Sequence, residues 1–73
     1  MARVEVTSEV TGNVWQVHIE VGANVEAEDV ILVLESMKME IPVSAPEDGT
    51  IKEIKVAEGE VVQEGAVIAV LES

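Results

Sequence analysis

The chain has 73 residues, enough for one small domain over residues 1–73, and its fifteen acidic and four basic side chains give a formal net charge of −11. This acidic excess argues against binding to nucleic acid or to an anionic membrane, because both need clustered Lys and Arg. The sequence also lacks cysteine, which excludes disulfides and zinc–thiolate sites, and lacks an apolar run of membrane-span or signal-peptide type, so we expect a cytoplasmic monomer.

The predicted elements are short β-strands, and no segment has a convincing helical period. Val and Ile make up 21 of the 35 hydrophobic residues, and β-branched side chains favour sheet over helix. In chain order, alternating apolar residues over 17–21 predict a half-buried strand, and the continuous apolar run over 30–34 predicts a strand covered on both faces. The alternation returns over 54–56. These patterns predict a small all-β domain.

Glycine and proline separate these runs and predict the turns. We expect each glycine to adopt a positive φ or to occupy a tight bend. Pro46 suits a strand entry or a turn and does not suit a central strand. The glycines are Gly12, Gly22, Gly49, Gly59 and Gly65.

The chain contains an internal repeat with an offset of 37 residues. Residues 12–36 align with residues 49–73 without a gap and are identical at nine of 25 positions. Two copies are too few for a solenoid, so we expect a closed or sandwich-like sheet of two pseudo-two-fold related four-strand motifs. The symmetry exchanges the 36–38 junction with the chain ends. Met1 and Ser73 should therefore lie together at the end of the molecule opposite Lys38.

The junction between the two copies reads Glu35-Ser36-Met37-Lys38-Met39-Glu40. One interpretation is a surface lysine on a hairpin whose two methionines fill gaps in the core. The other is a functional lysine on a tip where long apolar residues are exposed, a placement that stability alone does not favour. The position of the junction between two strands supports the second interpretation.

Four segments of the chain resemble the biotin carboxyl carrier domains of the biotin/lipoyl attachment family. Ser36-Met37-Lys38-Met39 resembles their Ala-Met-Lys-Met motif, and the resemblance covers nearly the whole chain, most closely matching short free-standing attachment proteins without a thumb loop. The other segments are Gly12-Asn13-Val14-Trp15, Gly22-Ala23-Asn24-Val25 and Ala45-Pro46-Glu47-Asp48-Gly49.

The resemblance implies a flattened β-barrel, called a barrel-sandwich hybrid, with Lys38 on an exposed tight turn. It implies that a biotin protein ligase joins biotin to the Lys38 amine, and that the attached biotin then carries a carboxyl group from a biotin carboxylase to a carboxyltransferase. The domain itself would catalyse nothing. Met37 and Met39 would offer adaptable apolar contacts to the ligase. Glu35 and Glu40 are either recognition residues or ordinary solvated flanks.

Ser36 departs from the motif, since the family has Ala at this position. Ser is small and suits a turn, so we expect modification to survive. The lipoyl branch of the family has Asp-Lys-Ala at this hairpin, and the methionines beside Lys38 favour biotin over lipoate. Lipoyl modification, dual modification and an unmodified acidic interaction domain stay open as alternatives.

Other conspicuous residues suggest less. Through the repeat, His18 aligns with Lys55 and Trp15 with Lys52, so we expect His18 to face solvent and Trp15 to be partly covered by neighbours, with a docking role as the alternative. The acidic residues show no calcium-loop spacing, and we expect neither a metal site nor a catalytic residue. The negative charge could keep the domain monomeric or steer it to basic partner surfaces.

Overall fold

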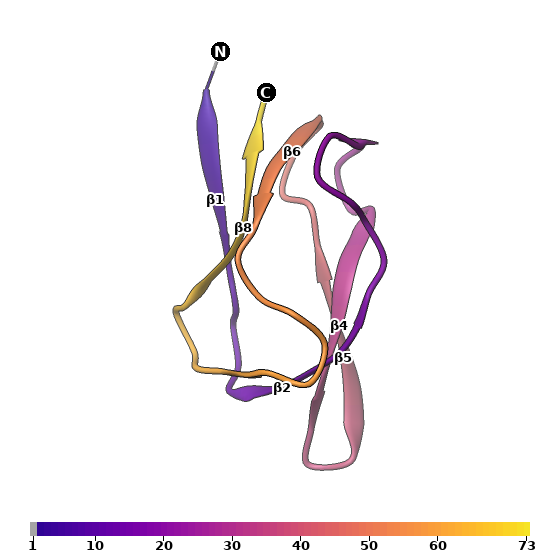
Figure 1. Ribbon diagram of the computed structural model, residues 1–73, viewed down its shortest axis with the longest axis vertical. Helices are drawn as coiled ribbons and strands as arrows, with labels where there is room; N and C mark the ends of the chain where they lie inside the picture. Colours follow the sequence, from indigo (N-terminus) through magenta and orange to yellow (C-terminus); the bar gives the residue numbers. More distant parts are fainter. Residues whose placement is uncertain (1) are drawn as a thin grey trace.

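The computed structural model describes residues 2–73 and contains strands, turns and loops, with no helix among these residues (Figure 1). It therefore has no helix in this part of the chain that could cross a membrane. The strands are β1 (Arg3–Thr7), β2 (Gly12–Val17), β3 (Asn24–Val25), β4 (Val30–Ser36), β5 (Met39–Ser44), β6 (Gly49–Ile54), β7 (Val61–Val62) and β8 (Val67–Glu72).

The strands form two antiparallel four-stranded sheets that pack into a flattened barrel. Sheet A has the order β1-β8-β6-β3, and sheet B has the order β5-β4-β2-β7. A shift of four in the strand number converts one order into the other, and the register shifts in the ladders recur at equivalent places. The expected all-β fold and its two pseudo-two-fold related four-strand motifs are confirmed.

The core lies between the two sheets and is built from equivalent residues of both motifs. Residues 31–34 and 68–71 are buried throughout, because β4 and β8 lie inside their sheets and have both faces covered. This confirms the strand predicted over 30–34. Pro42 lies on β5, an edge strand, where its missing N–H costs no ladder hydrogen bond.

Two predicted strands are wrong beyond their first residues. β2 ends at Val17, and β6 ends at Ile54. One further backbone bond follows each strand, from the His18 N–H to Ile31 O and from the Lys55 N–H to Ile68 O, both 2.8 Å. The chain then leaves its sheet and crosses to the other one, so the alternation over 17–21 and 54–56 continues in a connecting segment.

The glycine expectation is right at three positions and wrong at two. Gly22, Gly59 and Gly65 have φ values of 95°, 93° and 88°. Gly12 and Gly49 instead begin β2 and β6, where the backbone of a neighbouring strand lies against them: a Cβ on Gly12 would lie 2.8 Å from the Glu35 carbonyl oxygen. These two glycines are needed for close packing between strands.

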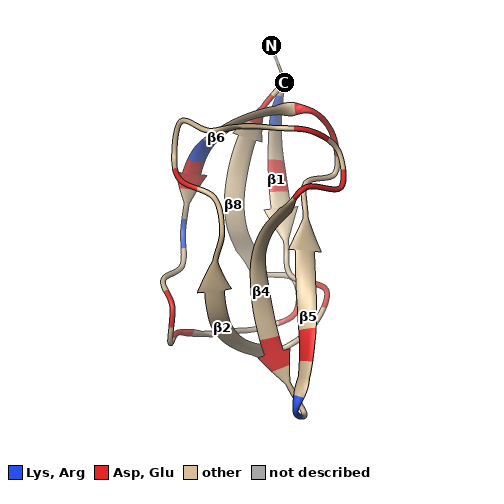
Figure 2. Ribbon diagram, turned by 90° about the vertical axis from the view of Figure 1, so that its right-hand side faces the viewer, with Lys and Arg blue, Asp and Glu red and all other residues tan. Residues whose placement is uncertain are grey.

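The start of β1 and the end of β8 lie at the opposite end of the molecule from the β4–β5 turn (Figure 1). Ala2 and Ser73 exchange two backbone hydrogen bonds of 3.1 and 2.9 Å. Ser73 therefore lies beside Ala2 at the end predicted for it, while the predicted position of Met1 falls outside the described residues. The molecule is elongated, 36 × 19 × 18 Å, and its long axis runs from the paired ends to the turn (Figure 2).

Candidate functional site

The candidate site is the hairpin that β4 and β5 form at one end of sheet B. Ser36 pairs with Met39 at its last rung, so the turn has only two residues, Met37 and Lys38. Their φ values are 51° and 65°. Positive φ at both positions is typical of a type I′ turn, the two-residue connection that matches the twist of the flanking strands. Such a turn favours Asn and Gly, so Met and Lys hold this backbone against their own preference.

The side chains of the turn face solvent. Met37 is 91% exposed and Met39 is 63% exposed, so the interpretation in which they fill the core is wrong. Lys38 is also exposed, and the ion pairs found among residues 2–73 are made by Lys52 and Lys55 instead. Figure 2 shows the basic residue of this turn at the tip of the molecule, with acidic residues on both strands beside it. An enzyme can therefore surround the Lys38 amine.

The rung that closes the turn is held to the loop between β1 and β2. The Ser36 hydroxyl donates a hydrogen bond of 2.9 Å to the Thr11 carbonyl oxygen. Gly12 lies against the Glu35 backbone. A Cβ placed on Gly12 would lie 3.3 Å from Ser36 Cβ. Ser36 thus gains a contact that the family's Ala would lack, and these contacts orient the tip.

Glu35 and Glu40 lie directly opposite each other one rung below Ser36 and Met39. Both are exposed. Like charges at directly opposite positions destabilise an antiparallel pair, so stability does not explain why both residues are acidic. They place two carboxylates immediately behind the lysine, where a basic group of a second protein can reach them.

The chemistry available here is that of an accessible primary amine. A lysine amine becomes a nucleophile when it loses its proton, and it then attacks an activated acyl group. No cluster of three or more His, Asp or Glu side chains that could hold a metal ion occurs within the described part of the chain. The arrangement leaves the Lys38 amine exposed to solvent at the end of the hairpin.

The remaining residues discussed from the sequence lie away from the hairpin tip. His18 is exposed, and its Nε2 is 2.8 Å from Gln16 Oε1, in agreement with a solvated position. Trp15 is 43% exposed on β2, so it is partly covered, as expected. Sequence reasoning missed Thr11 and the packing role of Gly12. The recurrence of Gly12 as Gly49 in the repeat was the available signal for the latter.

Comparison with known proteins agrees with this geometry. The chain is 44% identical over 63 residues to the biotin/lipoyl attachment protein of Bacillus subtilis, covering 86% of each chain. It is 40% identical over 67 residues to the biotinylated protein TB7.3 homolog of Mycobacterium leprae, covering 92% of this chain and 94% of that one.

Among solved structures, the urea carboxylase of Kluyveromyces lactis contains a region that superposes with a TM-score of 0.93 at 33% identity. That region covers 99% of this chain, which spans only 6% of the carboxylase. The sequence profile of the family described as "Biotin-requiring enzyme" matches residues 2–71. The chain belongs to the biotin/lipoyl attachment domain family.

Proposed function

We propose that this chain is a biotin carboxyl carrier protein and that Lys38 is its attachment residue. The observation that carries the proposal is the conformation of the β4–β5 turn, which holds an exposed lysine at positive φ between two exposed methionines. Neither residue of this turn serves the core. The names of the Bacillus subtilis and Mycobacterium leprae relatives support a covalently attached cofactor.

The residues of the hairpin fit the attachment of an acyl group. In a partner ligase, the deprotonated Lys38 Nζ attacks the carbonyl carbon of a biotinyl adenylate. The amide C–N bond forms, the C–O bond to the phosphate of AMP breaks, and AMP leaves. An ordinary lysine has a pKa of about 10.4 and is mostly protonated at neutral pH, so the ligase supplies the base that removes the proton.

The other hairpin residues have supporting roles in this proposal. Met37 and Met39 provide flexible apolar contacts that adapt to the ligase surface. Glu35 and Glu40 place their carboxylates where they can pair with basic groups of the ligase. The Ser36 bond to Thr11 keeps the hairpin in one orientation while Lys38 reacts.

Once attached, biotin accepts a carboxyl group on its ureido ring and transfers it. The protein then acts as a non-catalytic carrier between a biotin carboxylase and a carboxyltransferase, and its tether raises the effective concentration of the cofactor at both enzymes. The solved relative is a urea carboxylase, which supports partners of this class. The proposal includes a cytoplasmic location and a monomeric state, in keeping with the net charge of −11.

The test is the intact mass of the protein expressed together with biotin protein ligase and supplied with biotin. The wild-type chain should gain one biotinyl group and bind avidin. A Lys38→Arg variant should gain none, whereas Lys52→Arg, which changes a lysine on β6, should be modified like wild type. A biotinyl group on Lys52 or Lys55 would contradict the assignment of Lys38.

The same measurement decides between the two cofactors. Because the Bacillus subtilis relative is named for both biotin and lipoate, the experiment is repeated with lipoate ligase and lipoate. A lipoyl adduct on Lys38 without a biotinyl adduct would replace biotin by lipoate in the proposed function. Both adducts would establish dual modification.

A further inference from the structure

The two sheets have the same backbone but different outer surfaces. The row of outward residues nearest the hairpin tip runs across β5, β4, β2 and β7 of sheet B. The equivalent row of sheet A runs across β1, β8, β6 and β3, nearest the chain ends. Residue pairing identifies the sheet B row as Glu40, Glu35, Asn13 and Val61, and the sheet A row as Arg3, Glu72, Thr50 and Asn24.

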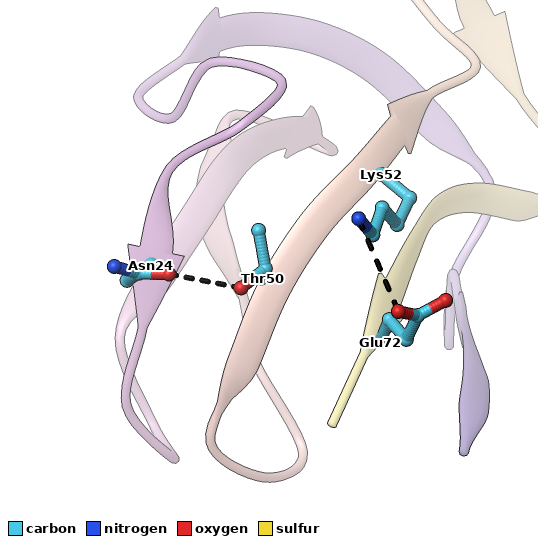
Figure 3. Close-up of polar contacts among 4 residues, drawn as sticks. All are labelled: Asn24, Thr50, Lys52 and Glu72. Carbon is cyan, nitrogen blue, oxygen red and sulfur yellow. Dashed lines mark hydrogen bonds and ion pairs between the residues drawn. The ribbon is translucent and has the colours of Figure 1, made fainter. Parts of the chain in front are cut away.

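The polar and charged side chains on the outer surface of sheet A pair with one another. The Thr50 hydroxyl donates a 2.9 Å hydrogen bond to Asn24 Oδ1, and Lys52 Nζ lies 3.9 Å from Glu72 Oε1 (Figure 3). Arg3 lies opposite Glu72 in the ladder. Next to this row, Lys55 lies 3.1 Å from Glu53, and this hydrogen bond and charge lower the pKa of the Glu53 carboxyl. Acids and bases therefore balance on this surface.

The equivalent positions of sheet B are apolar and exposed. Val61 replaces Asn24 and is 67% exposed, and Trp15 replaces Lys52 and is 43% exposed. On the adjacent rung, exposed Pro42 lies opposite Val33, where sheet A has Glu5 opposite Val70. The same fold thus accepts polar residues at these places, so stability does not require the apolar ones. We call Trp15, Val61 and Pro42 the sheet B patch.

The charges at the edge of the patch also differ from those of sheet A. Where sheet A sets Arg3 opposite Glu72, sheet B sets Glu40 opposite Glu35. The three bases other than Lys38 lie on or next to sheet A strands, at Arg3, Lys52 and Lys55. Sheet B thus has an apolar centre with uncompensated acidic residues towards the hairpin. Such a surface is complementary to an apolar protein surface with a basic rim.

The patch is close enough to Lys38 to share one interface with it. Glu35 is three residues from Lys38, and Trp15 lies between the rungs of Leu34 and Val33. At ~3.3 Å per residue, the distance along β4 from Lys38 to the level of Trp15 is about 15 Å. A standard interface buries about 800 Å² on each partner, equivalent to a disc of roughly 16 Å radius. An interface of this size that includes Lys38 and extends over the outer face of sheet B therefore covers the patch.

We propose that the sheet B patch is the docking surface for the ligase that acylates Lys38, an inference that rests on the proposed function. The ligase must bring the activated carboxyl group to Nζ itself, so it must surround the hairpin. The enzymes that act later meet the far end of a long flexible arm and need not touch the strands. Trp15 is the main apolar contact, and Val61 and Pro42 extend it. Glu35 and Glu40 pair with basic groups of the ligase at the edge of the patch.

The test transplants sheet A side chains onto sheet B. In the double variant Trp15→Lys and Val61→Asn, both positions receive the residues that the equivalent backbone already carries at Lys52 and Asn24. With purified biotin protein ligase, kcat/KM for Lys38 biotinylation should fall about tenfold or more, mainly through a higher KM, because a buried aromatic anchor is lost. Non-enzymatic acylation of Lys38 by free biotinyl adenylate should stay unchanged, since the turn is unaltered.

The control places the same pair on the opposite face. Lys52→Trp with Asn24→Val gives sheet A an apolar patch near the chain ends, and kcat/KM should remain within about twofold of wild type. Thermal unfolding by circular dichroism checks that each variant is folded. If Trp15→Lys with Val61→Asn does not fold, Val61→Asn alone takes its place, with an expected threefold or larger fall in kcat/KM.

The results separate this inference from the proposed function. Absence of any Lys38 adduct on the wild-type chain contradicts the proposed function. Normal wild-type modification together with an unchanged kcat/KM for the folded sheet B variant overturns the docking surface alone. An equal fall for the sheet A control would also overturn it, because the effect would not belong to one face.

Discussion

At the scale of single residues, the site depends on a turn whose sequence disagrees with its conformation. Met37 and Lys38 both adopt positive φ, which costs a non-glycine residue on the order of 1–3 kcal/mol. The pairing of β4 with β5 on one side and the Ser36–Thr11 bond on the other hold the turn in this state. These contacts fix the direction of the backbone at Lys38 relative to the barrel.

Replacing Met37 by Asn and Lys38 by Gly should stabilise the protein. Asn-Gly is the preferred pair for a two-residue turn of this type, so the free energy of unfolding should rise by about 1–2 kcal/mol. Urea unfolding followed by the fluorescence of Trp15 measures this change, and intact mass should show that modification is lost. A lower urea midpoint would mean that Met37 and Lys38 are not strained.

Replacing Ser36 by Ala tests the departure from the family motif. The variant loses the hydrogen bond to the Thr11 carbonyl oxygen, so the free energy of unfolding should fall by about 0.5–1.5 kcal/mol. Biotinylation should continue, because Ala is the family's own residue at this position. Urea unfolding and intact mass are the two measurements, and loss of the adduct would show that Ser36 is required for recognition by the ligase.

At the scale of elements, the sequence predicted the buried strands well and the edges poorly. Residues 30–34 were recognisable because a strand covered on both faces must be apolar along its whole length. The segment 17–21 was misleading because alternation reports which side chains face inward and carries no information on where the partner strand ends. Beyond Val17 the chain still turns Ile19 towards the core while it crosses to the other sheet.

The edge strands hide part of the repeat. In the structure β1 is equivalent to β5, so residues 2–11 match residues 39–48, yet the two segments share only Val6 with Val43. Edge strands bury few side chains, and the other positions are free to vary. The hairpin sequence suggested the proposed attachment site, but the contact between Ser36 and Thr11 joins residues 25 apart and had no signal in the sequence.

Gly12 and Gly49 form a matched pair for a test of the hairpin base. A Cβ at either position would lie 2.8 Å from a carbonyl oxygen, of Glu35 or of Glu72, so both Gly→Ala variants should lose about 1–3 kcal/mol of stability. Gly12→Ala moves the backbone beside Ser36, whereas Gly49→Ala moves the backbone at the far end.

The two variants should therefore differ in their rates of Lys38 biotinylation. Gly12→Ala should slow Lys38 biotinylation, while Gly49→Ala should leave the rate close to wild type at a temperature where both variants are folded. Single-turnover labelling with biotin protein ligase measures the rates. Equal slowing in both variants would show that the rate follows global stability and not the orientation of the hairpin.

At the scale of the whole molecule, the charge works against folding. A small domain with a formal charge of −11 repels itself, and the two surface ion pairs found among residues 2–73 contribute little in return. Raising sodium chloride from about 10 mM to about 500 mM shortens the screening length from roughly 30 Å to under 5 Å. Tm measured by circular dichroism should therefore rise by several degrees. A constant or falling Tm would show that the ion pairs outweigh the repulsion.

The symmetry of the molecule predicts that a circular permutant opened at the β4–β5 turn still folds. Ala2 and Ser73 are paired like Met39 and Ser36, so a two-residue Asn-Gly turn can join residue 73 to residue 2. A chain opened between Met37 and Lys38 begins at Lys38 and should fold to the same barrel by circular dichroism. Failure to fold would show that the β4–β5 turn is needed for assembly, in contrast to the equivalent gap at the other end.

Because the chain ends and the turn lie at opposite ends, the barrel acts as a rigid spacer between a linker and the lysine. Any polypeptide fused to Ala2 or Ser73 begins at one pole, and the lysine stands at the other along an axis of 36 Å. A linker can therefore move the whole barrel without obstructing the cofactor attached to Lys38 at the opposite end. The reach of the carrier then becomes the sum of three lengths, those of the linker, the rigid barrel and the flexible arm, and only the middle one is set by the fold.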